Sequence, residues 1–271
     1  MDDNYQTYVN RVIRLTLPET YQSQLQSIQT SIKFRPSAPG EPRLPAEFPG
    51  YTIATPPYGE DGASTDLYES LVLCQETLLK QLPEGLLTPV PPSSLHLTLA
   101  DLIWDGDYRS AIADDPDFER KLRQYVAQSF EQYRQMQLRG QVIRWQVLGL
   151  LVMPRAIAVC LAPREETSYE WIVQLRRLIY QNPSLVALGI EQQYHFTGHI
   201  TLGYFGDVPS ALEQGSPEAA AFAHPLADVL TQINQQWQEQ AKELHIQRVE
   251  LRKFDDMTRY YREPDWPVLE F

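Results

Sequence analysis

Two short stretches of this chain are nearly the same: Leu95-His96-Leu97-Thr98-Leu99-Ala100 and Gly198-His199-Ile200-Thr201-Leu202-Gly203. Each places a histidine two residues before a threonine within alternating apolar residues, a pattern that predicts a β-strand. Side chains two apart on a strand point to the same face, so each stretch should present an imidazole beside a hydroxyl. The apolar side chains on the opposite face are suited to packing against helices.

The polar face of each predicted strand extends beyond the histidine and the threonine. Ser94 precedes His96 on that face, and Thr197 precedes His199. A small residue follows each threonine, Ala100 in the first strand and Gly203 in the second. We therefore expect room for a bound molecule over both strands, within a first strand over 94–104 and a second over 195–206.

The chemistry of this pattern suits cleavage of a phosphate ester. An unperturbed imidazole has a pKa near 6.5, so one ring can be neutral and the other protonated at neutral pH. The neutral ring would act as general base and the protonated ring as general acid. His96 and His199 are the predicted catalytic residues. Thr98 and Thr201 are the predicted phosphate-binding residues, since their hydroxyls can donate to non-bridging oxygens.

Further residues are candidates for lining the substrate site. His195 shares the predicted face of His199 but lies about 13 Å along the strand, so we expect it at the rim or in the core. A metal site formed by His195 and His199 would need a helix, and Gly198 with its β-branched neighbours opposes one. No metal and no cofactor is predicted. The other candidates are Ser94, Thr197 and three aromatic residues that can stack on a base, Tyr58, Trp104 and Tyr204.

Composition narrows the partners and the location. The 271 residues carry a formal net charge of −12 and no run rich in Lys or Arg, which opposes binding of long double-stranded nucleic acid. No apolar run is long enough for a membrane span, and the acidic N-terminus lacks the pattern of a signal peptide. Cys74 and Cys160 are expected to be buried free thiols. We expect a cytoplasmic monomer acting on a small phosphodiester or an RNA end.

The chain divides into two predicted parts. Residues 1–50 form an N-terminal helical arm, helical over 1–35, followed by a proline-rich loop over 36–49. Residues 51–271 alternate strand and helix signals, including long helices at 117–137 and 225–243 and a last strand at 245–255. The histidine motifs lie in comparable strand–helix–strand units on either side of the midpoint. This arrangement is consistent with a weak internal duplication, with one motif in each half of the chain.

Paired His-x-Thr segments about a hundred residues apart resemble those of the 2H phosphoesterase superfamily, which includes cyclic phosphodiesterases and RNA ligase-like enzymes. The matching positions are His96-Leu97-Thr98-Leu99 and His199-Ile200-Thr201-Leu202. The resemblance implies a bilobal α+β fold, in which two antiparallel sheets flank a central cleft with helices outside. It also implies metal-independent cleavage of a 2′,3′-cyclic nucleotide, an RNA-end cyclic phosphate or a related small phosphodiester.

Two other functions remain open at this stage. The same cleft and side chains could serve a non-catalytic module that holds a nucleotide or phosphate. The long polar helices and the N-terminal arm could instead belong to a protein that binds a partner. Motifs for serine hydrolases, P-loop proteins and dinucleotide-binding proteins are absent from the sequence.

Overall fold

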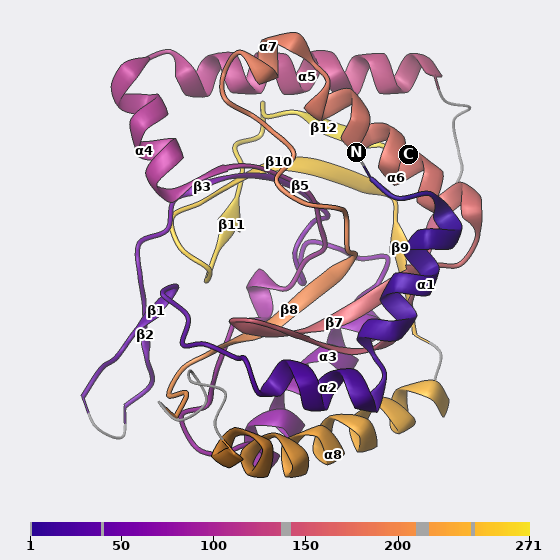
Figure 1. The fold of residues 1–271 in the computed structure, drawn as a ribbon. Helices are drawn as coiled ribbons and strands as arrows, with labels where there is room; N and C mark the ends of the chain where they lie inside the picture. Colours follow the sequence, from indigo (N-terminus) through magenta and orange to yellow (C-terminus); the bar gives the residue numbers. More distant parts are fainter. Residues whose placement is uncertain (1, 39–40, 137–141, 210–216, 240–241) are drawn as a thin grey trace.

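The computed structural model describes residues 2–38, 41–136, 142–209, 217–239 and 242–271, and they form an α+β fold of two facing sheets (Figure 1). All strand pairs among these residues are antiparallel. The predicted fold class is confirmed. In the same ranges no helix is both long and apolar enough to cross a membrane.

Each histidine motif belongs to a different sheet. The first sheet has the order β11-β10-β3-β5, with β12 also paired to β10. Its strands are β3 (Gly50–Ala54), β5 (Thr98–Trp104), β10 (Arg248–Phe254), β11 (Tyr260–Tyr261) and β12 (Val268–Glu270). The second sheet has the order β4-β8-β7-β6-β9. Its strands are β4 (Leu87–Pro89), β6 (Ile143–Met153), β7 (Ala156–Pro163), β8 (His199–Phe205) and β9 (Glu243–Ile246).

Helices cover the outer faces of both sheets (Figure 1). On the side of the first sheet lie α4 (Asp105–Asp114), α5 (Phe118–Met136), α7 (Pro183–Val186) and α6 (Glu166–Tyr180), which also contacts β6 and β7 of the second sheet. On the side of the second sheet lie α3 (Thr65–Gln81) and α8 (Pro217–Glu239). The periodicity of α5 shows why these helices pack there, because its buried residues recur every three or four positions. They are Phe118, Leu122, Val126, Ser129, Phe130 and Tyr133.

The N-terminal helices pack into the same hydrophobic core as the rest of the chain. Helix α1 (Tyr5–Leu15) begins after Asn4, whose side chain accepts a hydrogen bond from the Thr7 amide at 2.8 Å. Tyr8 is fully buried, and its hydroxyl donates to the Leu161 carbonyl of β7 at 2.9 Å. Helix α2 (Pro18–Leu25) packs against α8. The predicted domain boundary at residue 50 stays a prediction.

Several predicted element boundaries are wrong. The helical prediction for 1–35 fails at its end, where β1 (Phe34–Arg35) pairs with β2 (Leu44–Pro45) inside the proline-rich segment. The helix predicted over 225–243 in fact begins at Pro217 and contains Pro225. Its buried apolar face already includes Ala219 and Ala223, which precede that proline. The predicted end of the first long helix, at 137, lies outside the described residues. The predicted end of the second, at 243, is wrong, because Glu243 begins β9; residues 240–241 lie outside the described residues.

The predicted last strand, 245–255, is in fact two strands of different sheets. Strand β9 pairs with β6 in the second sheet, and β10 pairs with β3 in the first. An alternating pattern shows which residues form a strand but carries no information about the partner strand. The crossing at Gln247 therefore joins the two sheets and could not be seen in the sequence.

Candidate active site

A cavity of 410 Å³ lies between the two sheets and contains both histidine motifs. The first sheet contributes His96, just before β5, and Thr98 at the start of that strand. The second sheet contributes His199 and Thr201 from β8. The structure thus brings all four predicted side chains to one cavity, which we call the two-histidine cleft.

The two imidazoles are held in the same way. Nδ1 of His96 lies 2.6 Å from the carbonyl oxygen of Ser94, and Nδ1 of His199 lies 2.7 Å from that of Thr197. A carbonyl can only accept, so Nδ1 carries the proton in both rings. Nε2 is therefore the nitrogen left for chemistry. Nε2 of His96 lies 3.1 Å from the Thr98 hydroxyl, and among the described residues Nε2 of His199 has no hydrogen-bond partner.

The polar faces differ from the prediction because both strands bulge directly after the threonine. In β5 the register skips Leu99, since Ala54 pairs with Thr98 and Ile53 with Ala100. In β8 it skips Leu202, since Ala158 pairs with Thr201 and Ile157 with Gly203. A bulge adds one residue and reverses the faces that follow.

Because of the bulges, the residues predicted to follow the threonines on the polar faces are wrong. The prediction places Ala100 and Gly203 there, but Asp101 and Tyr204 line the cleft instead. The predicted strand starts are also wrong. Ser94 lies in the short 3-10 turn η1 (Pro92–Ser94), and β8 begins at His199, so that 195–198 precede the strand.

The carbonyl of each skipped residue accepts a hydrogen bond from a buried side chain of the helix behind it. The Leu202 carbonyl accepts from Gln75 of α3 at 2.7 Å and also from the Val90 amide at 3.1 Å. The Leu99 carbonyl accepts from Arg176 of α6, which is paired with the carboxylate of Asp2 at 2.7 Å. Arg176 and Gln75 are both buried. The two lobes therefore use equivalent devices to shape their histidine strands.

The surroundings of His96 favour its neutral form. Burial lowers its pKa most, and the positive charges near it, Arg252 and His199, lower it further. The hydrogen bond to Ser94 opposes these effects, and the resulting pKa is about 4, against an ordinary value of 6.5. The ring of Tyr260 also covers His96, with the ring centroids 4.0 Å apart. His96 is therefore neutral at physiological pH.

His199 has a different electrostatic environment. Burial again lowers its pKa most, and Lys33 adds to this effect. The carboxylate of Asp101 acts in the opposite direction and raises the pKa. His199 thus faces a negative charge that could balance an imidazolium, whereas His96 faces a positive one. The pKa of Asp101 is itself raised by burial, against the lowering effects of Lys33, His199 and Arg176.

The hydroxyl residues that precede the histidines line the cleft but are engaged elsewhere. The Ser94 hydroxyl donates to the Pro91 carbonyl at 2.9 Å. The Thr197 hydroxyl accepts from Arg11 of α1 at 2.7 Å, and Arg11 also donates to the Phe196 carbonyl at 2.6 Å. Their geometry assigns them to holding the rings, through the carbonyls that bind Nδ1.

The remaining predicted lining residues separate into three groups. His195 lies at the rim of the two-histidine cleft, with a side chain 62% exposed and Nδ1 3.5 Å from a carboxylate oxygen of Asp3. Tyr204 lines both this cleft and a second cavity beside it, and Trp104 lines the second cavity. Tyr58 lines neither cavity and instead stacks on Tyr68, with centroids 5.5 Å apart.

Sequence reasoning missed several residues that line the two-histidine cleft, among them Lys33, Asp101 and Tyr260. Asp101 is displaced onto the polar face by the bulge. Lys33 and Tyr260 come from the N-terminal segment and the C-terminal tail, which carry no motif. No group of three or more His, Cys, Asp or Glu side chains that could hold a metal ion occurs in the described part of the chain.

No family model matches this chain, and no curated protein matches it. Solved structures do match. The conserved protein of unknown function ATU0111 from Agrobacterium tumefaciens aligns with a TM-score of 0.53 and 16% identity, over 81% of this chain and 86% of that one. The two chains share a fold.

Two further solved structures align less closely. LigT from E. coli, crystallised with 3′-AMP, has a TM-score of 0.43 and 15% identity, over 82% of this chain and 99% of that one. TT0787 from Thermus thermophilus has a TM-score of 0.43 and 18% identity, over 82% of this chain and 95% of that one. Each of these two solved structures aligns over nearly the whole of its own chain.

Proposed function

We propose that this protein is a metal-independent phosphoesterase that cleaves a small phosphodiester in the two-histidine cleft. The substrate class is a 2′,3′-cyclic nucleotide, a cyclic phosphate at an RNA end or a related diester. One observation carries the proposal: two imidazoles from different sheets line one cavity, both with Nδ1 anchored to a carbonyl and Nε2 left for proton transfer.

The charges around the rings support different roles for them. His96 is the general base, since Arg252 and His199 favour its neutral form, and its Nε2 takes a proton from the attacking water. His199 is the general acid, since Asp101 raises its pKa against the net lowering that burial causes, and its Nε2–H gives a proton to the departing oxygen. The roles exchange when the reaction runs in reverse.

The threonines supply neutral hydrogen-bond donors to the phosphate. The Thr98 hydroxyl donates to Nε2 of His96, and it can rotate toward a non-bridging oxygen when substrate binds. Thr201 takes the equivalent place on β8. Lys33 adds a positive charge to the same cleft. These groups offset the charge of the phosphate in the transition state.

The test is hydrolysis of a panel of 2′,3′-cyclic nucleotides and of an oligoribonucleotide ending in a cyclic phosphate. We expect His96→Ala and His199→Ala each to lower kcat by at least about 10³-fold. The control is His224→Ala, at an exposed position on α8, which should keep the full rate. Activity should survive EDTA and follow a bell-shaped pH profile.

Two results would contradict the proposal. Wild-type rates in either cleft variant would remove the histidines from the reaction. Binding of nucleotides without turnover of any member of the panel would instead favour the non-catalytic module. Unfolding curves of each variant separate a loss of chemistry from a loss of fold.

A further inference from the structure

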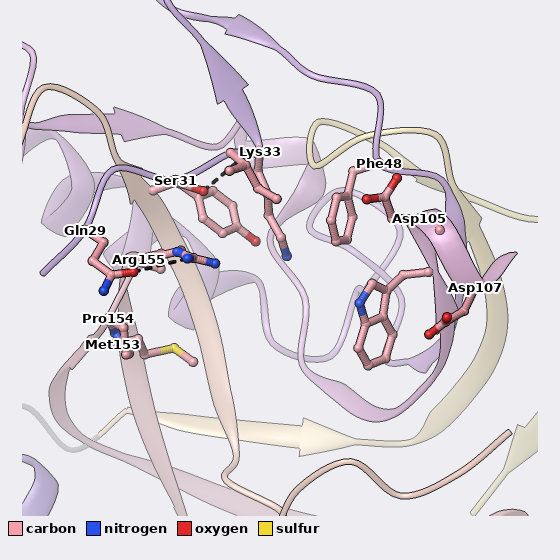
Figure 2. Close-up of a pocket in the computed structure, with 14 residues that line it drawn as sticks. Gln29, Ser31, Lys33, Phe48, Asp105, Asp107, Met153, Pro154 and Arg155 are labelled. Atoms are coloured by element: carbon pink, nitrogen blue, oxygen red, sulfur yellow. Dashed lines mark hydrogen bonds between the residues drawn. The ribbon is translucent and has the colours of Figure 1, made fainter. Parts of the chain in front are cut away.

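A second cavity of 730 Å³ adjoins the two-histidine cleft. Four residues line both: Lys33, Met153, Ala156 and Tyr204. The two cavities therefore form one groove with two compartments. Figure 2 shows the second compartment, with Gln29 and Arg155 on one side and Phe48, Asp105 and Asp107 on the other. Its volume falls within the range of small-molecule sites.

Strand β5 runs along both compartments because it bulges twice. The register skips Leu99 and again Leu102. Thr98, Asp101 and Trp104 are accordingly the partly exposed residues of the strand, three positions apart, while the residues between them are buried or nearly so. Thr98 and Asp101 line the two-histidine cleft, and Trp104 lines the second compartment. A regular strand would have turned one of the three away.

The boundary between the compartments holds a lysine. The ammonium of Lys33 lies 4.6 Å from the ring centroid of Phe48 and 5.1 Å from that of Tyr204. Within the described residues no carboxylate forms an ion pair with it. Its charge reaches both His199 and Asp101. A cation placed there by two aromatic rings is available to an anion in the groove.

The far wall carries acceptors. Asp105 and Asp107 line the compartment beyond Phe48 (Figure 2), and one carboxylate oxygen of Asp105 lies 3.5 Å from Nε of Arg109. Asp105 is the non-glycine residue with a positive φ among the described residues, at 45°, and its amide donates to the Pro49 carbonyl at 2.6 Å. Such backbone strain clusters at functional sites. Along the groove, the two histidines are therefore followed by the ammonium of Lys33, then by the aromatic rings of Phe48 and Trp104, and then by the carboxylates of Asp105 and Asp107.

This order matches a nucleotide placed lengthwise. We propose that the second compartment binds the base of a nucleotide whose scissile phosphate lies in the two-histidine cleft. Phe48 and Trp104 supply apolar and stacking surface, Lys33 contacts the phosphate side, and the aspartates accept from amino or imino N–H groups on the edge of the base. The inference rests on the proposed function and specifies its substrate as a base-bearing one, with guanine favoured by its adjacent N–H donors.

The N-terminal segment is essential to this compartment. Gln29, Ser31, Lys33 and Phe48 all precede the first strand of the first sheet. The segment is held against β8 by the amide of Ser31, which donates to the Phe205 carbonyl at 2.8 Å. We therefore assign part of the substrate selectivity to residues outside the two lobes that carry the histidines.

The test compares guanosine 2′,3′-cyclic phosphate with the base-free ribose 2′,3′-cyclic phosphate. Trp104→Ala should raise KM for the guanosine substrate by roughly 10- to 100-fold, the usual range for one stacked base. It should leave kinetics on the base-free compound unchanged. Trp237→Ala, a partly exposed tryptophan on α8, is the matched control and should affect neither. Equal effects of Trp104→Ala on both substrates, or no effect, would overturn the subsite.

A binding measurement separates this inference from the proposed function. Calorimetry with guanosine 3′-monophosphate reports on the subsite without catalysis, and Trp104→Ala and Lys33→Ala should each weaken binding by about 10-fold or more. If binding depends on Trp104 but no cyclic phosphate is turned over, the subsite stands and the reaction fails. If His96→Ala abolishes turnover but Trp104→Ala alters neither binding nor KM, the reaction stands and the subsite fails.

Discussion

Single residues explain why His96 and His199 differ electrostatically although both rings are held by the same kind of hydrogen bond. Both rings donate from Nδ1 to the carbonyl two residues earlier. Their charged neighbours differ, however: Arg252 lowers the pKa of His96, whereas Asp101 raises that of His199 against the lowering effect of Lys33. Arg252 is itself buried and paired with Glu250, and with Glu60 at 2.5 Å. Its charge is therefore fixed in place beside His96.

The lowered pKa of His96 makes the stability of the protein depend on pH. The unfolded chain binds a proton below about pH 6.5, while the folded ring stays neutral down to about pH 4. This contribution to stability is thus present above pH 6.5 and is lost as the pH falls from 6.5 to 4. Over that window we expect His96 to account for up to about 3 kcal/mol.

Denaturant unfolding of the wild type and of His96→Gln at several pH values measures this effect. As the pH falls, the free energy of unfolding of the wild type should decrease relative to that of the variant. Carboxylates that titrate in the same range are common to both proteins and cancel in the difference. A difference that stays constant between pH 7 and pH 4 would show that His96 has an ordinary pKa.

The histidines and threonines could be predicted from the sequence because the motif is local and occurs twice. Asp101 could not be predicted, because the bulge at Leu99 reverses which side chains of β5 face the cleft. The alternation of apolar and polar residues does not show where such a bulge occurs. Lys33 and Tyr260 could not either, since they reach the cleft from segments distant in the chain. Local patterns identify the reacting groups, and tertiary contacts determine their charges.

Secondary-structure elements shape the site through the paired bulges. Each bulge turns a side chain into the groove that a regular strand would hide, and the carbonyl of each skipped residue accepts from a helix side chain. In the first lobe that task falls to Arg176, whose other partners are Asp2 and the Tyr194 carbonyl. The helices behind the sheets thus maintain the register that the chemistry needs.

Replacing Arg176 by Met should therefore destabilise the protein strongly. The variant leaves the Leu99 carbonyl unsatisfied and the carboxylate of Asp2 buried without its counter-charge. Breaking a buried pair in this way costs about 3–5 kcal/mol. The double variant Asp2→Asn/Arg176→Met should lose less, because no buried charge remains. Denaturant unfolding measures both, and equal losses in the single and double variants would contradict this account.

At the scale of the whole molecule, the facing sheets and the helices outside them agree with the fold expected from the motifs and their resemblance. The strand partners do not follow from the sequence, as the split between β9 and β10 shows. The N-terminal helices likewise carry ordinary amphipathic patterns, and only the packed structure shows Arg11 holding the segment that precedes His199.

Charge is the other property of the whole molecule, and it limits the partners. A net charge of −12 surrounds a small groove with few cations, so attraction to phosphate acts only at contact range. We expect no mobility shift of a duplex of about 30 base pairs at about 10 μM protein and physiological salt. A shift that weakens steeply with added salt would reveal a basic surface that this account lacks.

The central claim is that both imidazoles act on one phosphate. A crystal structure grown with phosphate as the only added anion tests it most directly. We predict one anion in the two-histidine cleft, within hydrogen-bond distance of Nε2 of His96, Nε2 of His199 and the hydroxyls of Thr98 and Thr201. An anion bound elsewhere while the cleft holds none, or one that contacts a single histidine with the other ring turned away, would contradict the claim.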